Sequence, residues 1–100
     1  MANVASKVDK GQVVITIKGD FVFDVNSEFR EAYKKHPSHS RFLVDLSRAN
    51  YMDSAGLGML LQLREHAGGD QSRVAVRGFN DVIRDIFKVA NFHRLFDLGV

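Results

Sequence analysis

An acid, a hydroxyl and two glycines lie within the segment DSAGLG, residues 53–58, and an apolar run follows it. A serine in this setting can act as a nucleophile, cap a helix, help to hold a phosphate, or be modified by another protein. Each interpretation requires different neighbours around Ser54, so the surrounding sequence discriminates among them.

A serine hydrolase is the first alternative. Its nucleophile sits on a strained turn that needs glycine two residues before the serine, and Met52 occupies that position here. Asp85 or Asp97 and His93 do follow Ser54 in the chain. However, 100 residues are few for a hydrolase sheet with its lid and oxyanion loop, and no HGGG-type stretch precedes the serine. We therefore expect no enzyme.

A phosphate-binding loop is the second alternative. The P-loop requires G-x-x-x-x-G-K-[ST], and no Gly-Lys-Ser or Gly-Lys-Thr occurs in the sequence. The dinucleotide fingerprint G-x-G-x-x-G fails because Leu61 stands where the third glycine is required. The sequence therefore indicates no nucleotide site, and we expect no cofactor.

Two alternatives remain for Ser54. In a purely structural one, Asp53 or Ser54 is the N-cap of a helix and the glycines serve packing. Glycine costs up to ~1 kcal/mol relative to alanine in a helix, so such a helix has little reason to carry both Gly56 and Gly58. In the other, a partner kinase phosphorylates Ser54. The phosphate adds about −1.5 to −2 charge beside Asp53 and would repel a docked partner.

Alternating strand and helix patterns surround this segment. Residues 3–19 predict a β-hairpin with its turn at residues 9–11 and with Gly19 ending the second strand. Residues 24–36 predict a helix that Asp24, Asn26 or Ser27 caps and Pro37 ends. Its apolar face comprises Val25, Phe29, Ala32, Tyr33 and His36.

The second half of the chain repeats the alternation. The mostly apolar residues 41–47 are typical of a strand covered on both faces. A loop and a helix through about Ala67 should follow. After them we expect a strand at residues 73–78, a helix capped by Asn80, and a final strand after residue 91. The apolar stripe of that last helix comprises Val82, Ile83, Ile86, Phe87 and Ala90.

The predicted order is β-β-α-β-α-β-α-β. It indicates one α/β domain over residues 1–100, with a mixed sheet whose central strands are parallel and covered by helices. Asp53 and Ser54 then follow a strand at the carboxyl end of the sheet, where open α/β sheets place ligand and partner sites.

Composition excludes several classes of function. The chain has no cysteine, so disulfides and thiolate metal sites are excluded, and its four histidines show no H-x-x-x-H spacing. Its net charge is +2 without a dense basic run, which argues against direct nucleic-acid binding. No apolar run approaches the roughly 18 residues of a membrane helix, and the N-terminus has no apolar signal region. We expect a cytoplasmic protein that neither spans nor anchors to a membrane.

The segment NYMDSAGLGMLLQLRE, residues 50–65, resembles the signature of STAS domains, and specifically of bacterial anti-sigma-factor antagonists. In these proteins an apolar strand and a short loop precede Asp-Ser-[Ser/Thr/Ala]-Gly-Leu-Gly and an apolar helix. The sequence FLVDLSRANYMDSAGLGML has the same order. VIRDIFKVANFHRLF is similar to the last conserved helix and strand of the family, so the resemblance covers nearly the whole chain.

The resemblance implies a STAS fold and a partner switch. The unphosphorylated protein would bind an anti-sigma factor that is also a serine kinase, and so release the kinase's target. The kinase would phosphorylate Ser54 and abolish binding, and a metal-dependent Ser/Thr phosphatase would reset the protein. Asp53 matches the family's acidic neighbour, which orients the hydroxyl or helps recognition.

Two further functions stay open within the family. One is the same switch controlling an output other than a sigma factor. The other is a non-phosphorylated STAS subunit with an assembly role, for instance in a transporter or a lipid-trafficking complex. The presence of Ser54 counts against the assembly role, because such subunits often lack this serine.

We also expect a partner surface around Ser54. Strand ends at one edge of the sheet bring together the contact residues Asp20, Phe21, Asp24, Tyr51, Met52, Ala55, Gly56, Leu57, Gly58 and Met59. Tyr51 and Met52 are expected in a loop, and the two glycines should allow close approach. Phe21 and Phe23 suit either the core or a partner patch, and Met59 suits either the core or an adaptable contact.

Overall fold

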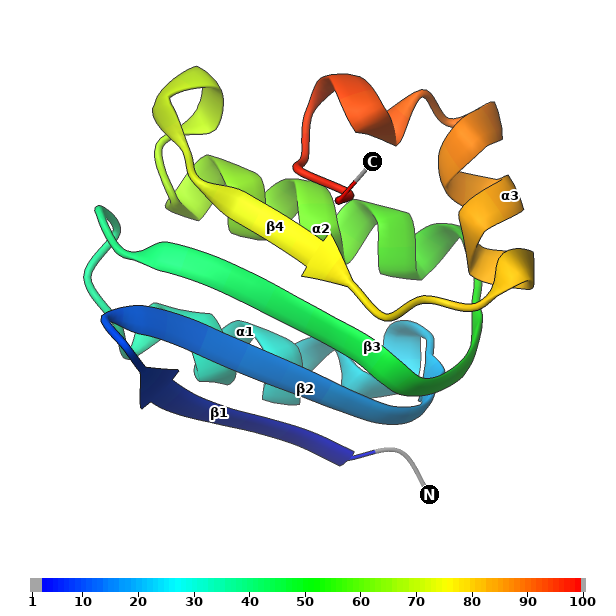
Figure 1. Ribbon diagram of the computed structural model, residues 1–100. Helices are drawn as coiled ribbons and strands as arrows, with labels where there is room; N and C mark the ends of the chain where they lie inside the picture. Colours follow the sequence, from blue (N-terminus) through cyan, green and yellow to red (C-terminus); the bar gives the residue numbers. More distant parts are fainter. Residues whose placement is uncertain (1–2, 100) are drawn as a thin grey trace.

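The computed structural model of the protein describes residues 3–99, which form a four-stranded sheet and three α-helices (Figure 1). β1 (Asn3–Asp9) pairs antiparallel with β2 (Gln12–Phe21), and β3 (Arg41–Met52) and β4 (Val74–Arg77) continue the sheet in parallel. The helices are α1 (Asn26–Lys34), α2 (Ser54–His66) and α3 (Asp81–Val89). The predicted α/β architecture with parallel central strands is therefore confirmed.

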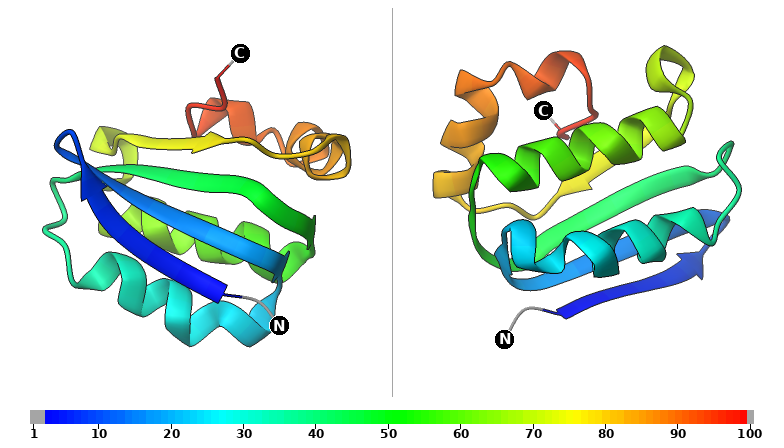
Figure 2. Two further views of the ribbon diagram at one scale, coloured as in Figure 1. Left: turned by 60° about the horizontal axis from the view of Figure 1, so that its bottom comes forward. Right: turned by 180° about the vertical axis from the view of Figure 1, so that it is seen from behind.

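Helices α1 and α2 cover one face of the sheet, and α3 lies beyond the β4 edge (Figure 2). Val13, Ile15 and Ile17 alternate along β2 and are all buried, as predicted. Their register neighbours in β3 include the buried Phe42 and Val44. One apolar face of each central strand thus builds the core with the two helices.

The other face of the sheet is more open than predicted. Leu43 and Asp45 on that face of β3 are only half-buried, and Ser47 is exposed. The expectation that this strand is covered on both faces is therefore wrong, because α1 and α2 lie on the same side of the sheet.

The strands around the site are longer than predicted. Gly19 does not end β2, which continues to Phe21 and pairs Asp20 with Tyr51 of β3. Gly19 has φ 94°, and the register shifts beside it. Because glycine adopts a left-handed conformation without strain, it allows a bulge in the strand rather than an end.

A 3-10 turn, η1 (Phe23–Val25), precedes α1, so the helix itself begins at Asn26. None of the three expected capping side chains makes a cap hydrogen bond, and the residue at the cap position is Val25. The predicted apolar face is otherwise present. Val25, Phe29, Ala32 and Tyr33 are buried and His36 is half-buried.

The cap predicted for α3 is confirmed, because the Asn80 side-chain oxygen accepts a 3.0 Å hydrogen bond from the backbone N–H of Ile83. The predicted stripe is only partly buried. Ile83 and Phe87 are in the core and Ile86 is half-buried, whereas Val82 is 55% exposed and Ala90 is exposed. The helix lies at the edge of the sheet, where only a narrow stripe can reach the core.

The predicted final strand is wrong. After α3 the chain forms a 3-10 turn, η3 (Phe92–Arg94), and the only pairing to β4 after that turn within residues 3–99 is an isolated bridge between Ala75 and Asp97. Phe92 stacks on Phe87 at 5.4 Å and on Phe96 at 5.0 Å between ring centroids. The turn brings the Phe92 and Phe96 rings into contact, whereas residues four apart in a strand share a face but lie about 13 Å from each other.

Within residues 3–99 no helix has the length and apolar character needed to cross a membrane. In the same part of the chain, no three histidine, aspartate or glutamate side chains gather as a metal site would require.

Candidate functional site

Ser54 is the first residue of α2, at the carboxyl end of β3. β3 continues through Met52, so Asp53 alone separates the strand from the helix. The loop expected at Tyr51 and Met52 is therefore strand, because both residues pair with the end of β2. Ser54 is exposed. Figure 1 shows the short connection through which β3 leads into α2.

Asp53 is the N-cap of α2. Its Oδ1 accepts hydrogen bonds from the N–H groups of Ala55 at 2.9 Å and Gly56 at 3.2 Å. The carboxylate also lies at the positive end of the helix dipole. Of the two caps that the sequence left open, the structure selects Asp53. The N–H groups that would otherwise cradle an anion are thus already occupied.

The Ser54 hydroxyl makes no hydrogen bond to any other residue in the described range 3–99, and His93 is not bonded to it. A serine nucleophile needs a base within hydrogen-bond reach. The described residues therefore do not assemble a Ser-His pair, and the exposed hydroxyl is available to an outside group instead.

The two glycines of α2 have different surroundings. A Cβ on Gly56 would lie 2.3 Å from Met52 Cγ and 2.7 Å from the Phe21 carbonyl oxygen, whereas a Cβ on Gly58 would have nothing within 4 Å. Gly56 is buried and lets α2 pack against the ends of β2 and β3. The expectation that both glycines admit a partner is wrong for Gly56, and only Gly58 leaves open surface.

Some of the other expected contact residues are buried and some are exposed. Phe21 and Met52 are 0% exposed and Met59 is 3% exposed, so these three side chains belong to the core and cannot touch a partner in this conformation. By contrast, Phe23 is 68% exposed and Tyr51 is 48% exposed. The alternatives left open for Phe21 and Met59 are resolved in favour of the core, and Phe23 joins the accessible surface.

The remaining expected contact residues are accessible to different degrees. Asp20 and Asp24 are exposed, and Asp20 is the register partner of Tyr51. Ala55 and Leu57 are half-buried in the first turn of α2. The structure thus brings Asp20, Tyr51 and the start of α2 to one end of the sheet.

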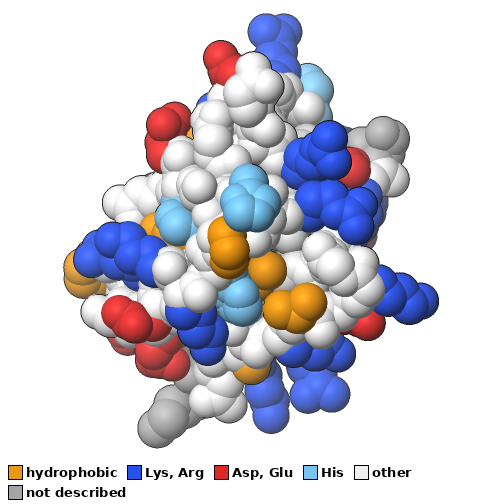
Figure 3. Space-filling view, turned by 90° about the vertical axis from the view of Figure 1, so that its left-hand side faces the viewer, with side chains coloured by type: hydrophobic (Ala, Val, Ile, Leu, Met, Phe, Trp, Pro, Cys, Tyr) orange, Lys and Arg blue, Asp and Glu red, His pale blue; other side chains and the backbone are white. Residues whose placement is uncertain are grey.

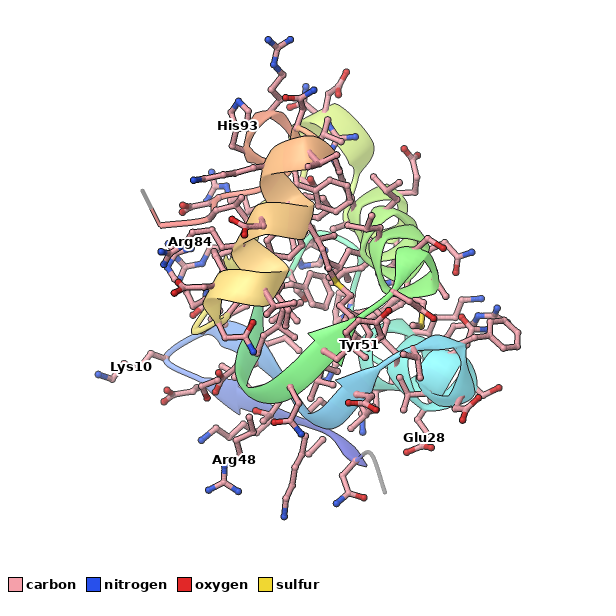
Figure 4. All side chains as sticks on the ribbon, turned by 90° about the vertical axis from the view of Figure 1, so that its right-hand side faces the viewer. Lys10, Glu28, Arg48, Tyr51, Arg84 and His93 are labelled. Carbon is pink, nitrogen blue, oxygen red and sulfur yellow. The ribbon has the colours of Figure 1, made fainter. Side chains whose placement is uncertain are left out.

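An open hollow of about 420 Å³ lies beside these residues. Its lining comprises Gly19, Asp20, Val22, Asp24, Val25, Glu28 and Asn50. Three of these residues are carboxylates, and Figure 4 shows Glu28 and Tyr51 at this end of the molecule. Glu28 and Asn50 are not among the contact residues predicted from the sequence. Glu28 follows Asp24 by four residues in the predicted helix, so the two share a helix face, and this spacing could have indicated Glu28.

The other end of the sheet has a different character. Figure 3 shows histidines near the middle of this end, with Lys and Arg side chains around them. His39 and Arg73 line a hollow there, and His66 Nε2 lies 3.3 Å from the His36 carbonyl oxygen. Histidines and basic side chains thus gather at this end, where Asp and Glu side chains are also visible.

A family model and a related protein both place the chain among STAS domains. Residues 5–98 match the family described as "Mlab, STAS domain". A STAS-domain-containing protein of Pseudomonas aeruginosa (strain UCBPP-PA14) is 38% identical over 92 residues, which are 91% of this chain and 91% of that protein.

Solved structures share the fold at low identity. An anti-sigma factor antagonist from Mycobacterium paratuberculosis superposes with a TM-score of 0.80 at 16% identity, over 96% of this chain and 83% of that one. The anti-sigma factor antagonist SpoIIAA in its unphosphorylated form gives a TM-score of 0.73 at 17% identity, over 98% of this chain and 89% of that one. At such identities the likeness concerns the fold.

Proposed function

Because the chain belongs to the STAS-domain family, we propose that it is a phosphorylatable anti-sigma-factor antagonist that acts in the cytoplasm. Its unphosphorylated form binds an anti-sigma factor that is also a serine kinase, and so releases the target of that factor. Phosphorylation of Ser54 abolishes binding, and a metal-dependent Ser/Thr phosphatase resets the protein.

The observation that carries this proposal is the exposure of Ser54 at the start of a helix whose first N–H groups are already bonded to Asp53. An exposed hydroxyl is reachable by a kinase. A phosphate on it would find the Ala55 and Gly56 N–H groups occupied by the Asp53 carboxylate. The added charge would therefore stay at the surface, where it acts on a partner.

The partner surface is proposed to comprise exposed side chains of β2, β3 and η1 together with the bare helix turn at Gly58. Tyr51 and Phe23 supply large apolar contacts, and aromatic residues of this kind dominate many interfaces. Asp20 and Asp24 add negative charge. A partner with a basic surface would complement this end of the molecule.

The phosphate would act as an electrostatic switch on this surface. It adds about −1.5 to −2 charge next to Asp53 and near the carboxylates of the hollow. Where the partner packs against α2, this charge would be buried while the Ala55 and Gly56 N–H groups are already bonded to Asp53, and burying an unpaired charge is costly. Phosphorylation would also add a bulky group where the partner must approach α2 closely, so both effects favour release.

The proposal is tested with the kinase partner isolated in complex with the protein. On addition of ATP, the intact mass of the wild type should rise by one phosphate group and the complex should dissociate. Ser54→Ala should gain no mass and stay bound. Ser27→Ala, which removes another exposed serine near the same end, should behave like the wild type. Phosphate on Ser54→Ala would refute the assignment of the site.

The output of the switch is a separate question. The surface around Ser54 would serve equally for a kinase partner that controls a sigma factor and for one that controls another target. Identifying the protein that the partner releases when this chain binds distinguishes the two. A complex that forms and persists regardless of ATP and of Ser54 would instead indicate the assembly role.

A further inference from the structure

A small apolar pocket of about 220 Å³ lies on α3 and the segment after it, away from the residues proposed to bind a partner. Its lining comprises Phe79, Arg84, Phe87, Lys88, His93 and Leu98, which we call the α3 pocket. Figure 4 shows Arg84 and His93 on the opposite side of α3 from Tyr51 and Glu28. The pocket is therefore separate from the Ser54 surface.

The apolar walls of the α3 pocket are held in place by packing. Phe87 is 1% exposed, and its ring meets Phe79 edge to face at 5.1 Å and stacks on Phe92 at 5.4 Å between centroids. Leu98 follows Asp97, whose backbone bonds to β4 at Val74 and Val76. The rings and the leucine form a preformed apolar cleft, which suits a small ligand.

Three cationic or basic side chains line this cleft and no carboxylate does. The Arg84 guanidinium lies 5.9 Å from the centre of the Phe79 ring and pairs with Asp81 at 3.3 Å. Within residues 3–99, neither Lys88 nor His93 forms a salt bridge. Positive charge is thus concentrated at the mouth of an apolar cleft, without an acidic residue to balance it at Lys88.

We propose that the α3 pocket binds a small amphiphilic carboxylate with a compact aliphatic body. The aliphatic body lies between Phe79, Phe87 and Leu98, and the carboxylate bonds to Lys88 and His93 at the mouth. The pocket is smaller than the ~300–1,000 Å³ of sites for drug-sized molecules, which limits the ligand to a short chain. Charge complementarity selects an anion over a neutral molecule of the same shape.

Binding at this place would be linked to the stability of the protein. A ligand that binds only the folded state stabilises it in proportion to the logarithm of its concentration over Kd. The ligand would also reduce repulsion among the positive charges at the mouth. Occupancy of the α3 pocket should therefore raise the melting temperature, independently of the state of Ser54.

Octanoate is the probe that tests the proposal, with 1-octanol and acetate as matched controls. In an amide NMR titration of the full chain, octanoate should shift the signals of Phe79, Phe87 and Leu98 to saturation. Octanol, which has the same aliphatic body without the charge, should bind several-fold more weakly, and acetate should cause no saturable shift.

Single substitutions test the charged mouth and the apolar walls of the α3 pocket separately. Lys88→Gln should weaken octanoate binding roughly two- to fivefold, as expected for an exposed charge pair, and Leu98→Ala should weaken it by removing apolar contact. Lys34→Gln, which removes an exposed lysine on α1, should leave it unchanged. Circular dichroism verifies that each variant is folded.

Three results would overturn the proposal. One is the absence of saturable shifts at the pocket residues with octanoate. Another is equal affinity for octanol and octanoate, which would show that the charges at the mouth do not contribute. The third is binding of octanoate that neither Lys88→Gln nor Leu98→Ala weakens, since the ligand would then bind elsewhere.

Discussion

Gly56 and Gly58 lie two residues apart in α2, yet they differ in what surrounds them. Gly56 is enclosed by Met52 and by the Phe21 carbonyl, while Gly58 faces open space. The same residue type therefore serves packing at one position and leaves a bare helix surface at the other. Only the second property is useful to a partner that must come close to the helix.

Alanine substitutions should separate these two roles. Gly56→Ala forces a Cβ against backbone and should lower the free energy of unfolding by about 1–3 kcal/mol, as overpacking typically does. The added Cβ of Gly58→Ala meets no other atom, so this variant should raise the free energy of unfolding by up to ~1 kcal/mol through the higher helix propensity of alanine. Urea denaturation of both variants measures the difference. Equal stability of the two would contradict the contacts assigned to Gly56.

Gly58→Ala also tests the partner surface. If the proposed partner approaches the open turn of α2, the variant should bind that partner more weakly although it is more stable. Gln62→Ala, farther along the exposed part of α2, is the matched control and should bind like the wild type. Undiminished binding of Gly58→Ala would remove this turn from the proposed interface.

Ser54 and Asp53 differ in what their side chains do for the fold. Asp53 bonds two backbone N–H groups, whereas Ser54 bonds none within residues 3–99. We predict that Ser54→Asp changes the free energy of unfolding by at most about 0.5 kcal/mol, as is usual for exposed positions. The same variant should bind the kinase partner more than tenfold more weakly, because it buries a charge without a hydrogen-bond partner at a closely packed interface.

Calorimetric binding and urea denaturation of the same Ser54→Asp preparation measure both quantities. Ser27→Asp adds the same charge at an exposed position of α1 and controls for net charge. A large loss of stability in Ser54→Asp would mean that the effect on binding comes from unfolding. Wild-type affinity would contradict the burial of an unpaired charge as the mechanism of release.

Among the elements, the segment after α3 shows how a short stretch is held without forming a strand. Its backbone touches β4 through an isolated bridge at Asp97, whose side chain also pairs with Arg77 at 3.0 Å. The hydrogen bond from Arg77 and another from the Gly99 N–H lower the pKa of the Asp97 carboxyl. This carboxylate therefore helps to hold Leu98 in place beside the α3 pocket.

The lowered pKa of Asp97 predicts a pH dependence. A carboxyl whose pKa is lower in the folded state stabilises the fold above its unfolded value, near 3.8, and this contribution is lost as the pH falls below that value. The stability difference between wild type and Asp97→Asn should therefore shrink as the pH decreases from 6 to 3. The effect should be small, because the side chain is 66% exposed.

Thermal unfolding at several pH values measures this difference, with Asp85→Asn as a control. Asp85 is exposed on α3 and makes no salt bridge within residues 3–99. A difference between wild type and Asp97→Asn that stays constant across this pH range would contradict a contribution from the charged carboxylate.

At the scale of the whole molecule, carboxylates form a local cluster beside Ser54. The end that carries Ser54 has the hollow with Asp20, Asp24 and Glu28, although the chain as a whole has a net charge of +2. The opposite end presents histidines with Lys and Arg side chains (Figure 3). Such a distribution orients a charged partner before contact and increases its association rate.

We predict that Asp20→Asn combined with Asp24→Asn slows association with the kinase partner at low salt. The difference from the wild type should diminish as the salt concentration rises, because ions screen exposed charges beyond a Debye length of about 10 Å at 0.1 M. Stopped-flow kinetics with the purified partner measures both rates. Asp9→Asn, at the end of β1 beside the hairpin turn, should have no effect. Faster association of the double variant would indicate an acidic partner surface instead.

Local sequence patterns predicted the order of the elements through α3 and the character of the site, but not the turn that replaces the expected final strand. Periodic apolar residues predicted each of the three helices and four strands. The cap at Asn80 was predictable because a capping side chain bonds to a backbone N–H within the first turn of its own helix. The segment DSAGLG indicated the family and placed Ser54 at the start of a helix. These features depend on residues that are close together in the chain, so they can be predicted from the sequence.

Which side chains around the segment DSAGLG are accessible depends on the tertiary structure. Phe21, Met52 and Met59 are apolar and near the site, as Phe23 and Tyr51 are, but the first three are buried by the meeting of β2, β3 and α2. The hollow at Glu28 and the pocket on α3 likewise combine residues from separate elements. Burial depends on contacts between segments distant in the chain, and local sequence patterns do not contain that information.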